Sequence, residues 1–223
     1  MTYKPQPRVG NASWRRRKMV EEQLRHRGII DARVLAAMCS VPREEFVPDE
    51  FREAAYDDRP LPIGHEQTIS QPFTVAFMCE ALQLRGHEKV LEIGAGSGYG
   101  AAVLTKLAAE VFTIERIPQL AEEARQRLKK LGYETVHVIT GDGTAGLPDE
   151  APFDAIVVTA GADTLPDAYP RQLCDGGRII IPLGLQARGQ TMYRVTKWKD
   201  ELQFEDLGPF SFVPLIGGAV GHF

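Results

Sequence analysis

The middle of the chain alternates short apolar runs with longer segments in which apolar residues recur every three or four positions. Short apolar runs predict buried strands, and the longer periodic segments predict helices that cover them. We expect strands at residues 89–93, 111–115, 136–140, 154–159 and 178–182, with helices at residues 99–108 and 118–131. This order, with short turns, predicts an α/β fold with a doubly wound, mostly parallel Rossmann-like sheet and helices on both faces.

The residues before this alternation predict a helical extension. Ser13 to Arg27 has the apolar spacing of an amphipathic helix that Gly28 can end, and Asp31 is placed to cap a second short helix. Five prolines between Pro42 and Pro72 break any long element, so we expect an ordered loop region there. A loop of this length inside a compact domain is unusual unless it forms a binding surface. A helix is expected to follow at residues 72–84.

A length of 223 residues predicts one domain with terminal extensions. We divide it into a helical and substrate-loop extension at residues 1–85, a core at residues 86–185, and C-terminal strands at residues 186–223. Strand-like stretches between Thr191 and Val213 are expected to pair antiparallel at one edge of the sheet.

Composition and charge restrict the class of protein. With 43% hydrophobic and 25% charged residues, the chain has the composition of a soluble globular protein. A formal net charge of -4 gives no basic field of the kind that attracts nucleic acid. The basic run Arg15 to Lys18 is followed at once by Glu21 and Glu22, which indicates a solvated helix face. We therefore expect no nucleic-acid partner.

Cysteine spacing and the chain ends bear on metals and location. The three cysteines are widely separated and lack a CxxC partner or a histidine at ligand spacing, so no metal site is predicted. The polar segment Met1 to Asn11 lacks the apolar run of a signal peptide, and no stretch is long enough to span a membrane. We expect a cytoplasmic protein with no membrane partner, and a monomer, since no long apolar stripe predicts a dimer.

A glycine-rich turn follows the first strand of the expected sheet. Gly94, Gly96 and Gly98 form a GxGxG pattern between that strand and the next helix. Glycine allows backbone N–H groups to approach a ligand at the carboxyl end of the strand, where a Cβ would obstruct them. A dinucleotide fingerprint would need its third glycine at position 99, which is Tyr99. Taken alone, this pattern is a weak signal, because a tight turn that binds nothing can have the same glycines.

Acidic residues end the next two strands. Glu115 closes an apolar strand about twenty residues after the glycines, where a carboxylate can accept hydrogen bonds from both hydroxyls of a ribose. Asp142, between Gly141 and Gly143, lies where it can accept from an adenine amine. Each has a simpler reading, a surface glutamate and an Asp-Gly turn. Together with the glycine turn, they predict an adenosine site without a pyrophosphate.

Several motifs outside this site resemble one family of class I S-adenosylmethionine (AdoMet) methyltransferases, the protein-L-isoaspartate O-methyltransferases. The resemblance covers about residues 13–217. Its motifs are Val41–Pro48, Ala55–Asp58, Leu61–Gly64, Gln67–Pro72, Ala151–Ile156 and Phe212–Leu215. The glycine turn is shared by many methyltransferases, whereas Gln67–Pro72 and Phe212–Leu215 are far more restricted.

The resemblance implies a reaction and a set of site residues. The reaction would be methyl transfer from AdoMet, leaving S-adenosylhomocysteine (AdoHcy), to the free α-carboxyl of L-isoaspartyl residues in aged peptides and proteins. The ester then cyclises to a succinimide, whose hydrolysis partly restores aspartate. Ser70 would be the active-site residue with Thr68 beside it, and Ile69, Val213 and Pro214 would hold the peptide. We assign cofactor binding to Gln67, Glu92, Gly94, Ala95, Gly96, Ser97, Gly98, Glu115, Arg116, Gly141, Asp142 and Gly143.

One position departs from the family pattern. Glu66 stands just before Gln67, where the family usually has glycine. If the backbone there adopts a positive φ, Glu66 is strained, and its charge lies near an anionic substrate.

The acceptor chemistry fits the residues that the chain offers. A carboxylate with a reference pKa near 4 is already ionised at neutral pH, so no general base is required. Alignment of donor and acceptor in a dry pocket would then supply the catalysis. Ser70 would bind the substrate carboxylate, or alternatively would cap the helix that follows it.

Other functions remain open at this point. A nucleic-acid amino-methylating enzyme would carry an Asn/Asp-Pro-Pro-aromatic motif where this chain has Thr159 to Asp163. A nicotinamide-dependent oxidoreductase is disfavoured by Tyr99. A methyltransferase with a small-molecule acceptor, and a non-catalytic AdoMet- or peptide-binding protein, are the remaining alternatives.

Overall fold

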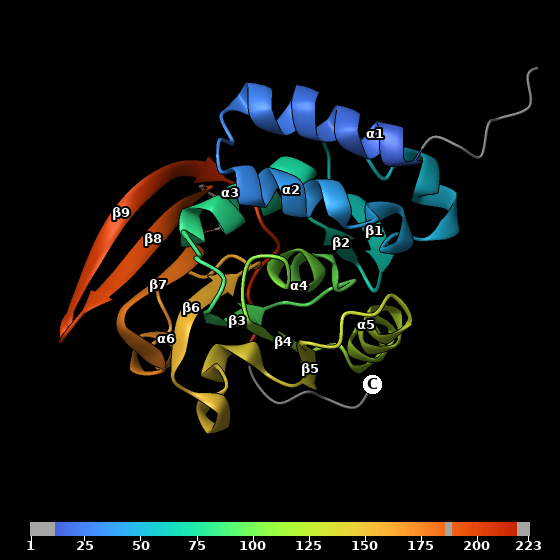
Figure 1. Ribbon diagram of the computed structural model, residues 1–223. Helices are drawn as coiled ribbons and strands as arrows, with labels where there is room; N and C mark the ends of the chain where they lie inside the picture. Colours follow the sequence, from blue (N-terminus) through green and yellow to red (C-terminus); the bar gives the residue numbers. More distant parts are fainter. Residues whose placement is uncertain (1–11, 186–188, 218–223) are drawn as a thin grey trace, which may run out of the picture.

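A seven-stranded sheet forms the centre of the protein (Figure 1). The computed structural model describes residues 12–185 and 189–217. The strands are β3 (Lys89–Ile93), β4 (Glu110–Glu115), β5 (Val136–Thr140), β6 (Phe153–Val158), β7 (Leu173–Leu183), β8 (Gln190–Trp198) and β9 (Glu201–Phe210). Their order is β5-β4-β3-β6-β7-β8-β9. The first five run parallel, and β8 and β9 add antiparallel at one edge, which confirms the predicted fold class.

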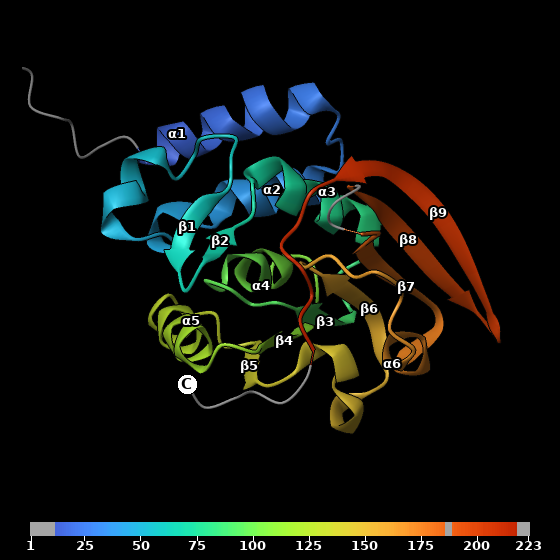
Figure 2. The ribbon, with the colours of Figure 1, turned by 180° about the vertical axis from the view of Figure 1, so that it is seen from behind.

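Helices cover both faces of the sheet. They are α1 (Ala12–Lys18), α2 (Ala32–Ser40), α3 (Pro72–Leu82), α4 (Tyr99–Leu104), α5 (Pro118–Lys130) and α6 (Ala168–Arg171). Helices α3, α4 and α5 lie on one face, with α1 and α2 in a further layer beyond α3 and α4, whereas the short α6 lies against the other face (Figures 1 and 2). Side chains alternate along each strand, so Val90 and Leu91 enter different hydrophobic clusters.

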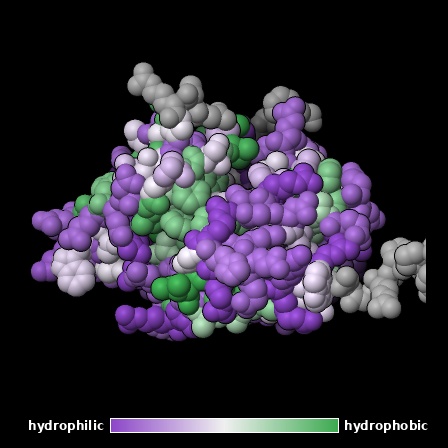
Figure 3. All heavy atoms as spheres, turned by 90° about the horizontal axis from the view of Figure 1, so that it is seen from above, coloured by the Kyte–Doolittle hydropathy of each residue, from purple (hydrophilic) through white to green (hydrophobic). Residues whose placement is uncertain are grey.

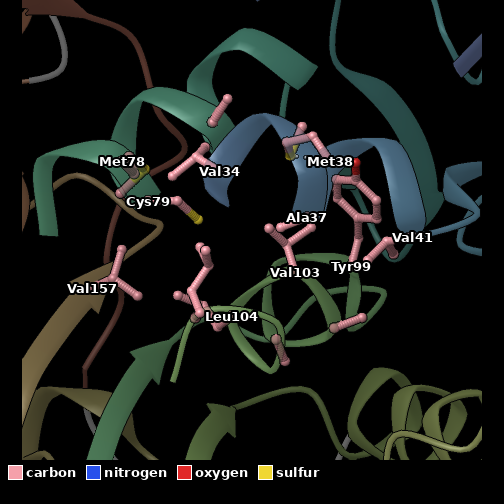
Figure 4. Packing of buried hydrophobic residues seen from close by; sticks show 14 of the residues in the cluster. Val34, Ala37, Met38, Val41, Met78, Cys79, Tyr99, Val103, Leu104 and Val157 are labelled. Carbon is pink, nitrogen blue, oxygen red and sulfur yellow. Dashed lines mark hydrogen bonds between the residues drawn. The ribbon is translucent and has the colours of Figure 1, made fainter. Parts of the chain in front are cut away.

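The N-terminal helices share their core with the sheet. Figure 4 shows apolar side chains of α2, α3 and α4 meeting in one cluster, among them Met38, Cys79 and Val103. Each is at most 5% exposed. Burying a side chain of the size of Met or Val stabilises the fold by about 1.5–3 kcal/mol. The extension is therefore packed on the core and holds the loops that it carries in fixed positions.

The first helical segment confirms the predicted helix. Helix α1 continues through a π-helical turn at Met19–Leu24 and a 3-10 turn at Arg25–Arg27, and ends at Gly28 with a φ of 99°. Two residues of the basic run form ion pairs with other parts of the extension, Arg15 with Glu53 and Arg16 with Glu44. From above, polar side chains cover the region over α1, with a band of apolar side chains beside it (Figure 3).

The structure differs from the sequence expectations in three elements. The loop region at residues 42–72 contains two 3-10 helices and a hairpin of β1 (Leu61–Gly64) and β2 (Gln67–Ile69). Helix α4 ends four residues earlier than predicted, where the Thr105 hydroxyl donates to the carbonyl of Ala102. Strand β7 spans Leu173–Leu183 and so extends beyond the predicted residues 178–182 at both ends.

Candidate functional site

The glycine turn connects β3 to α4 in a conformation that requires glycine. Gly94 and Gly98 have φ values of 99° and 88°, in the left-handed region. The hydroxyl of Thr159, just after β6, donates to the carbonyls of Ile93 (2.9 Å) and Gly94 (2.8 Å). A Cβ on Gly94 would collide with that hydroxyl. The turn is therefore closely packed against the neighbouring strand end, and its residues Gly94 to Ser97 line the cleft.

Glu115 stands at the end of β4, next to this turn. Its carboxylate accepts hydrogen bonds from the backbone N–H groups of Gly96 and Ile117, both at 2.9 Å. The side chain is buried, with 6% exposed, and lines the cleft. A carboxylate held by two backbone donors in this way is fixed in position and retains lone pairs for a ligand hydroxyl.

Glu92, in β3, is a second carboxyl of the cleft and is fully buried. The hydroxyl of Thr113 donates to it at 2.6 Å. Burial raises the pKa of Glu92 to about 8, the Thr113 hydrogen bond opposes this shift, and the nearby charge of Glu115 adds to it. At neutral pH the folded protein thus holds Glu92 mainly in its neutral form.

Asp142 ends the adjacent strand β5 and shapes the loop that follows. It caps a short 3-10 helix at Gly143–Ala145 by accepting from the backbone N–H (2.9 Å) and the hydroxyl (2.7 Å) of Thr144. The Tyr169 hydroxyl donates to the carbonyl of Gly143 at 3.0 Å. These bonds fix the backbone of the loop at the carboxyl edge of the sheet.

The hairpin β1–β2 brings the Gln67–Ser70 motif to the same edge. Its two turn residues, His65 and Glu66, have φ values of 50° and 58°. Two consecutive left-handed residues are the geometry of a tight two-residue hairpin, and they favour glycine, asparagine or aspartate. The expectation for Glu66 is thereby confirmed: its backbone is in the left-handed region that a glutamate adopts at a cost.

Ser70 does not cap the helix that follows it. Helix α3 begins at Pro72, and its N-cap is Gln71, whose side chain makes no capping hydrogen bond. Ser70 is half-buried and is one of the residues that line the cleft, while its carbonyl accepts from the Arg43 guanidinium at 2.8 Å. The hypothesis that Ser70 serves as the helix cap is wrong.

The segment after β9 closes the cleft from the other side. The N–H of Gly161 donates to the carbonyl of Val213 (2.8 Å), and the N–H of Leu215 donates to the carbonyl of Gly161 (2.7 Å). Gln190 accepts from the N–H of Phe212 at 2.8 Å. Figure 2 shows this segment running past β3 and β6.

One cleft therefore brings together parts of the chain that are far apart in the sequence. It encloses about 880 Å³ when the open space at its mouth is counted. The predicted residues that line it are Gln67, Thr68, Ile69, Ser70, Glu92, Gly94, Ala95, Gly96, Ser97, Glu115, Arg116, Gly143, Val213 and Pro214. Gly98, Gly141 and Asp142 are not among its lining residues; they shape the turns beside it.

Several lining residues were not predicted. They are Val75, Ile93, Tyr99, Gly100, Ile114, Thr159, Ala160, Leu215 and Ile216. Thr159 and Ala160 follow a parallel strand, so the rule that identified Glu115 and Asp142 applies to them as well. Val75 and Tyr99 carried no such signal, because they enter the cleft through helix packing. Among residues 12–185 and 189–217, no group of three or more His, Cys, Asp or Glu is placed to bind a metal, and no helix could cross a membrane.

Comparison with known proteins identifies the family. The family model for protein-L-isoaspartate(D-aspartate) O-methyltransferase matches residues 14–220. The chain belongs to this family. The family is AdoMet-dependent, and the sequence resemblance is thereby confirmed. One curated relative, protein-L-isoaspartate O-methyltransferase 2 of Pelobacter propionicus, is 52% identical over 95% of this chain and 94% of the relative. Another, protein-L-isoaspartate O-methyltransferase 2 of Marinobacter nauticus, is 54% identical over 91% of this chain and 93% of the relative.

Solved structures agree with this assignment to the isoaspartate methyltransferase family. One protein-L-isoaspartate O-methyltransferase is 32% identical with a TM-score of 0.80, covering 92% of this chain and 67% of its own. A second structure is a Plasmodium falciparum protein described as a protein-L-isoaspartate O-methyltransferase, in complex with S-adenosyl-L-homocysteine. It is 27% identical with a TM-score of 0.76, and the match covers 90% of this chain and 98% of that one. The family fold thus extends over nearly the whole chain.

Proposed function

We propose that this protein transfers the methyl group of AdoMet to the free α-carboxyl of L-isoaspartyl residues in damaged peptides and proteins, which starts repair through a succinimide. The observation that carries the proposal is the meeting of two independent residue sets in one cleft. The strand-end set around Gly94 and Glu115 suits a nucleoside, and the set of Gln67–Ser70 with Val213–Pro214 carries the family's restricted motifs.

The residues of the strand-end set suit AdoMet. Gly94 and Gly96 of the turn line the cleft with backbone that carries no side chain, and the fixed carboxylate of Glu115 suits the two hydroxyls of a ribose. Gln67, Arg116 and the 141–143 loop would complete the site. When bound, AdoMet supplies a methyl group on a positively charged sulfur. After the transfer, AdoHcy remains with a neutral sulfur.

The chain's own part in the reaction is to bind and align an acceptor that is already a nucleophile. An isoaspartyl carboxylate is ionised at neutral pH, so its oxygen can attack the methyl carbon while the carbon–sulfur bond breaks, with no proton to remove. Ser70 would donate a hydrogen bond to this carboxylate and hold it in line, with Thr68 beside it. Ile69, Val213 and Pro214 would hold the peptide backbone and exclude water.

Labelled AdoMet and a matched pair of peptides, one with isoaspartate and one with aspartate, test the function. We expect label in the isoaspartyl peptide only. Label in both peptides, or in neither, would contradict the specific assignment. Label in neither peptide together with AdoHcy binding would favour a non-catalytic binding protein, and label only in a small-molecule acceptor would favour another methyltransferase.

Ser70→Ala tests the role of the serine. Loss of a hydrogen bond to a charged group costs about 1.5–3 kcal/mol, so we expect turnover to fall roughly 10- to 100-fold. Ser211→Ala is a matched control, because Ser211 is exposed and outside the cleft. Unchanged turnover of Ser70→Ala per molecule of enzyme that binds AdoHcy would remove Ser70 from the mechanism.

We further propose that the chain acts as a single-domain monomer in the cytoplasm, on polypeptides and without a metal. The net charge of -4 supports a substrate other than nucleic acid. Light scattering of the purified protein tests the monomer, and activity retained after treatment with a chelator tests the absence of a metal.

A further inference from the structure

A fully buried arginine lies directly behind the cleft. Arg43, in the 3-10 helix Arg43–Glu45 of the N-terminal extension, is 0% exposed and is one of the largest completely buried side chains. Its guanidinium makes no ion pair with a carboxylate anywhere in the described part of the chain. An arginine remains charged under ordinary conditions, so its burial carries a desolvation cost that the nearby charge of Asp58, which forms no direct ion pair with it, offsets only in part.

The contacts of Arg43 connect three separate segments. Its Nε donates to the carbonyl of Ala55 at 2.7 Å, and its Nη2 donates to the carbonyl of Ser70 at 2.8 Å. The guanidinium also lies over the ring of Tyr99, 4.8 Å from the ring centre. Its Nη1 is buried without a hydrogen-bond partner among residues 12–185 and 189–217.

Two of these contacts are with residues that line the cleft. The Ser70 carbonyl belongs to the acceptor side, and because the peptide unit is planar, fixing this carbonyl restrains the backbone that carries the Ser70 side chain. Tyr99 belongs to the donor side, since it is the first residue of α4 and follows the glycine turn directly. Both residues line the cleft, whereas Arg43 does not.

We propose that Arg43 is a positioning residue, whose buried guanidinium fixes Ser70 relative to the Gly94–Gly98 turn and thereby sets the alignment of acceptor and donor. This inference rests on the proposed function. Methyl transfer needs the attacking oxygen, the methyl carbon and the sulfur nearly in line, and a displacement of about 1 Å can lower the rate about 100-fold. The planar fork of arginine can donate to two carbonyls at once, which the ammonium group of lysine cannot reproduce in the same geometry.

Arg43→Lys and Arg43→Met test the proposal, with Arg16→Lys as the matched control. Arg16 also bridges segments of the extension, through the Tyr56 hydroxyl and the Ser40 carbonyl, but it contacts neither Ser70 nor Tyr99. We expect both Arg43 variants to lose roughly 10- to 100-fold in kcat while AdoHcy affinity changes less than about twofold. Arg16→Lys should retain the wild-type kcat even if it lowers the melting temperature.

A double-mutant cycle separates positioning from a merely structural role. If Arg43 acts through Ser70, then Arg43→Lys in a Ser70→Ala background should cause little further loss of kcat. An unchanged kcat in both Arg43 variants, additive losses in the cycle, or parallel loss of AdoHcy binding and turnover would each overturn the proposal. Failure of the wild-type protein to methylate the isoaspartyl peptide would instead count against the proposed function, which keeps the two failures distinguishable.

Discussion

Glu92→Gln should make the protein more stable than wild type, by an amount that grows with pH. In the folded wild type, burial raises the pKa of Glu92 to about 8 from an ordinary 4.5. Below pH 4.5 the carboxyl of Glu92 is neutral in both the folded and the unfolded protein, and it contributes no pH dependence to stability. Between 4.5 and 8 the unfolded chain is ionised and the folded chain is not, so the free energy of unfolding falls by about 1.4 kcal/mol per pH unit.

Above pH 8 Glu92 is ionised in both the folded and the unfolded protein, so its cost to the free energy of unfolding becomes constant. This cost is then on the order of 5 kcal/mol. Glutamine keeps the shape of the side chain and can accept from Thr113, but it does not ionise. Other titrating groups are common to both proteins, so they largely cancel in the difference.

Urea unfolding at pH 5, 6, 7, 8 and 9 measures this difference. Between pH 6 and pH 9 we expect the stability advantage of Glu92→Gln to increase by about 3 kcal/mol, most of it below pH 8. If the difference in unfolding free energy between the two proteins stays constant across this pH range, within about 0.5 kcal/mol, Glu92 ionises normally in the folded protein. An advantage that shrinks with rising pH would refute the sign of the argument.

Three further predictions concern the same cleft. Binding of AdoMet near pH 7 should release a proton from Glu92, because a cationic ligand favours the ionised carboxyl; calorimetry in two buffers of different ionisation enthalpy should detect it in wild type and not in Glu92→Gln. Glu66→Gly should raise the free energy of unfolding by about 1 kcal/mol, because it relieves the left-handed conformation at φ 58°, and it should lower KM for anionic peptides; an unchanged urea midpoint would contradict the strain. Glu115→Gln should weaken AdoHcy binding roughly 10- to 100-fold, because an amide replaces the carboxylate that is expected to bind the ribose. The amide also turns an N–H donor toward the backbone N–H of Gly96 or Ile117. Equal AdoHcy affinities of wild type and Glu115→Gln by calorimetry would exclude ribose binding by Glu115.

The nucleoside side of the cleft could be predicted because each of its features is local. The turn at Gly94–Gly98 and the acid at Glu115 follow apolar strands directly, and parallel strands bring their carboxyl ends to one edge whatever else the chain does. The same reasoning extends to Thr159. The β1–β2 hairpin was missed because Pro60 and Pro62 break the strand pattern and because the turn lacks the Asn-Gly or Asp-Gly signal.

By itself, then, the sequence determined the parallel sheet, the site of the glycine turn and the family to which the motifs belong. Only the tertiary structure decided that Ser70 faces the cleft and does not cap α3, that Val213 lies across the strand ends, and that Arg43 is buried between Ser70 and Tyr99. The physical reason is that strand and turn patterns depend on neighbouring residues, whereas these contacts join segments separated by 27 to 56 residues. Such contacts depend on how helices and loops pack, and no local periodicity records that packing.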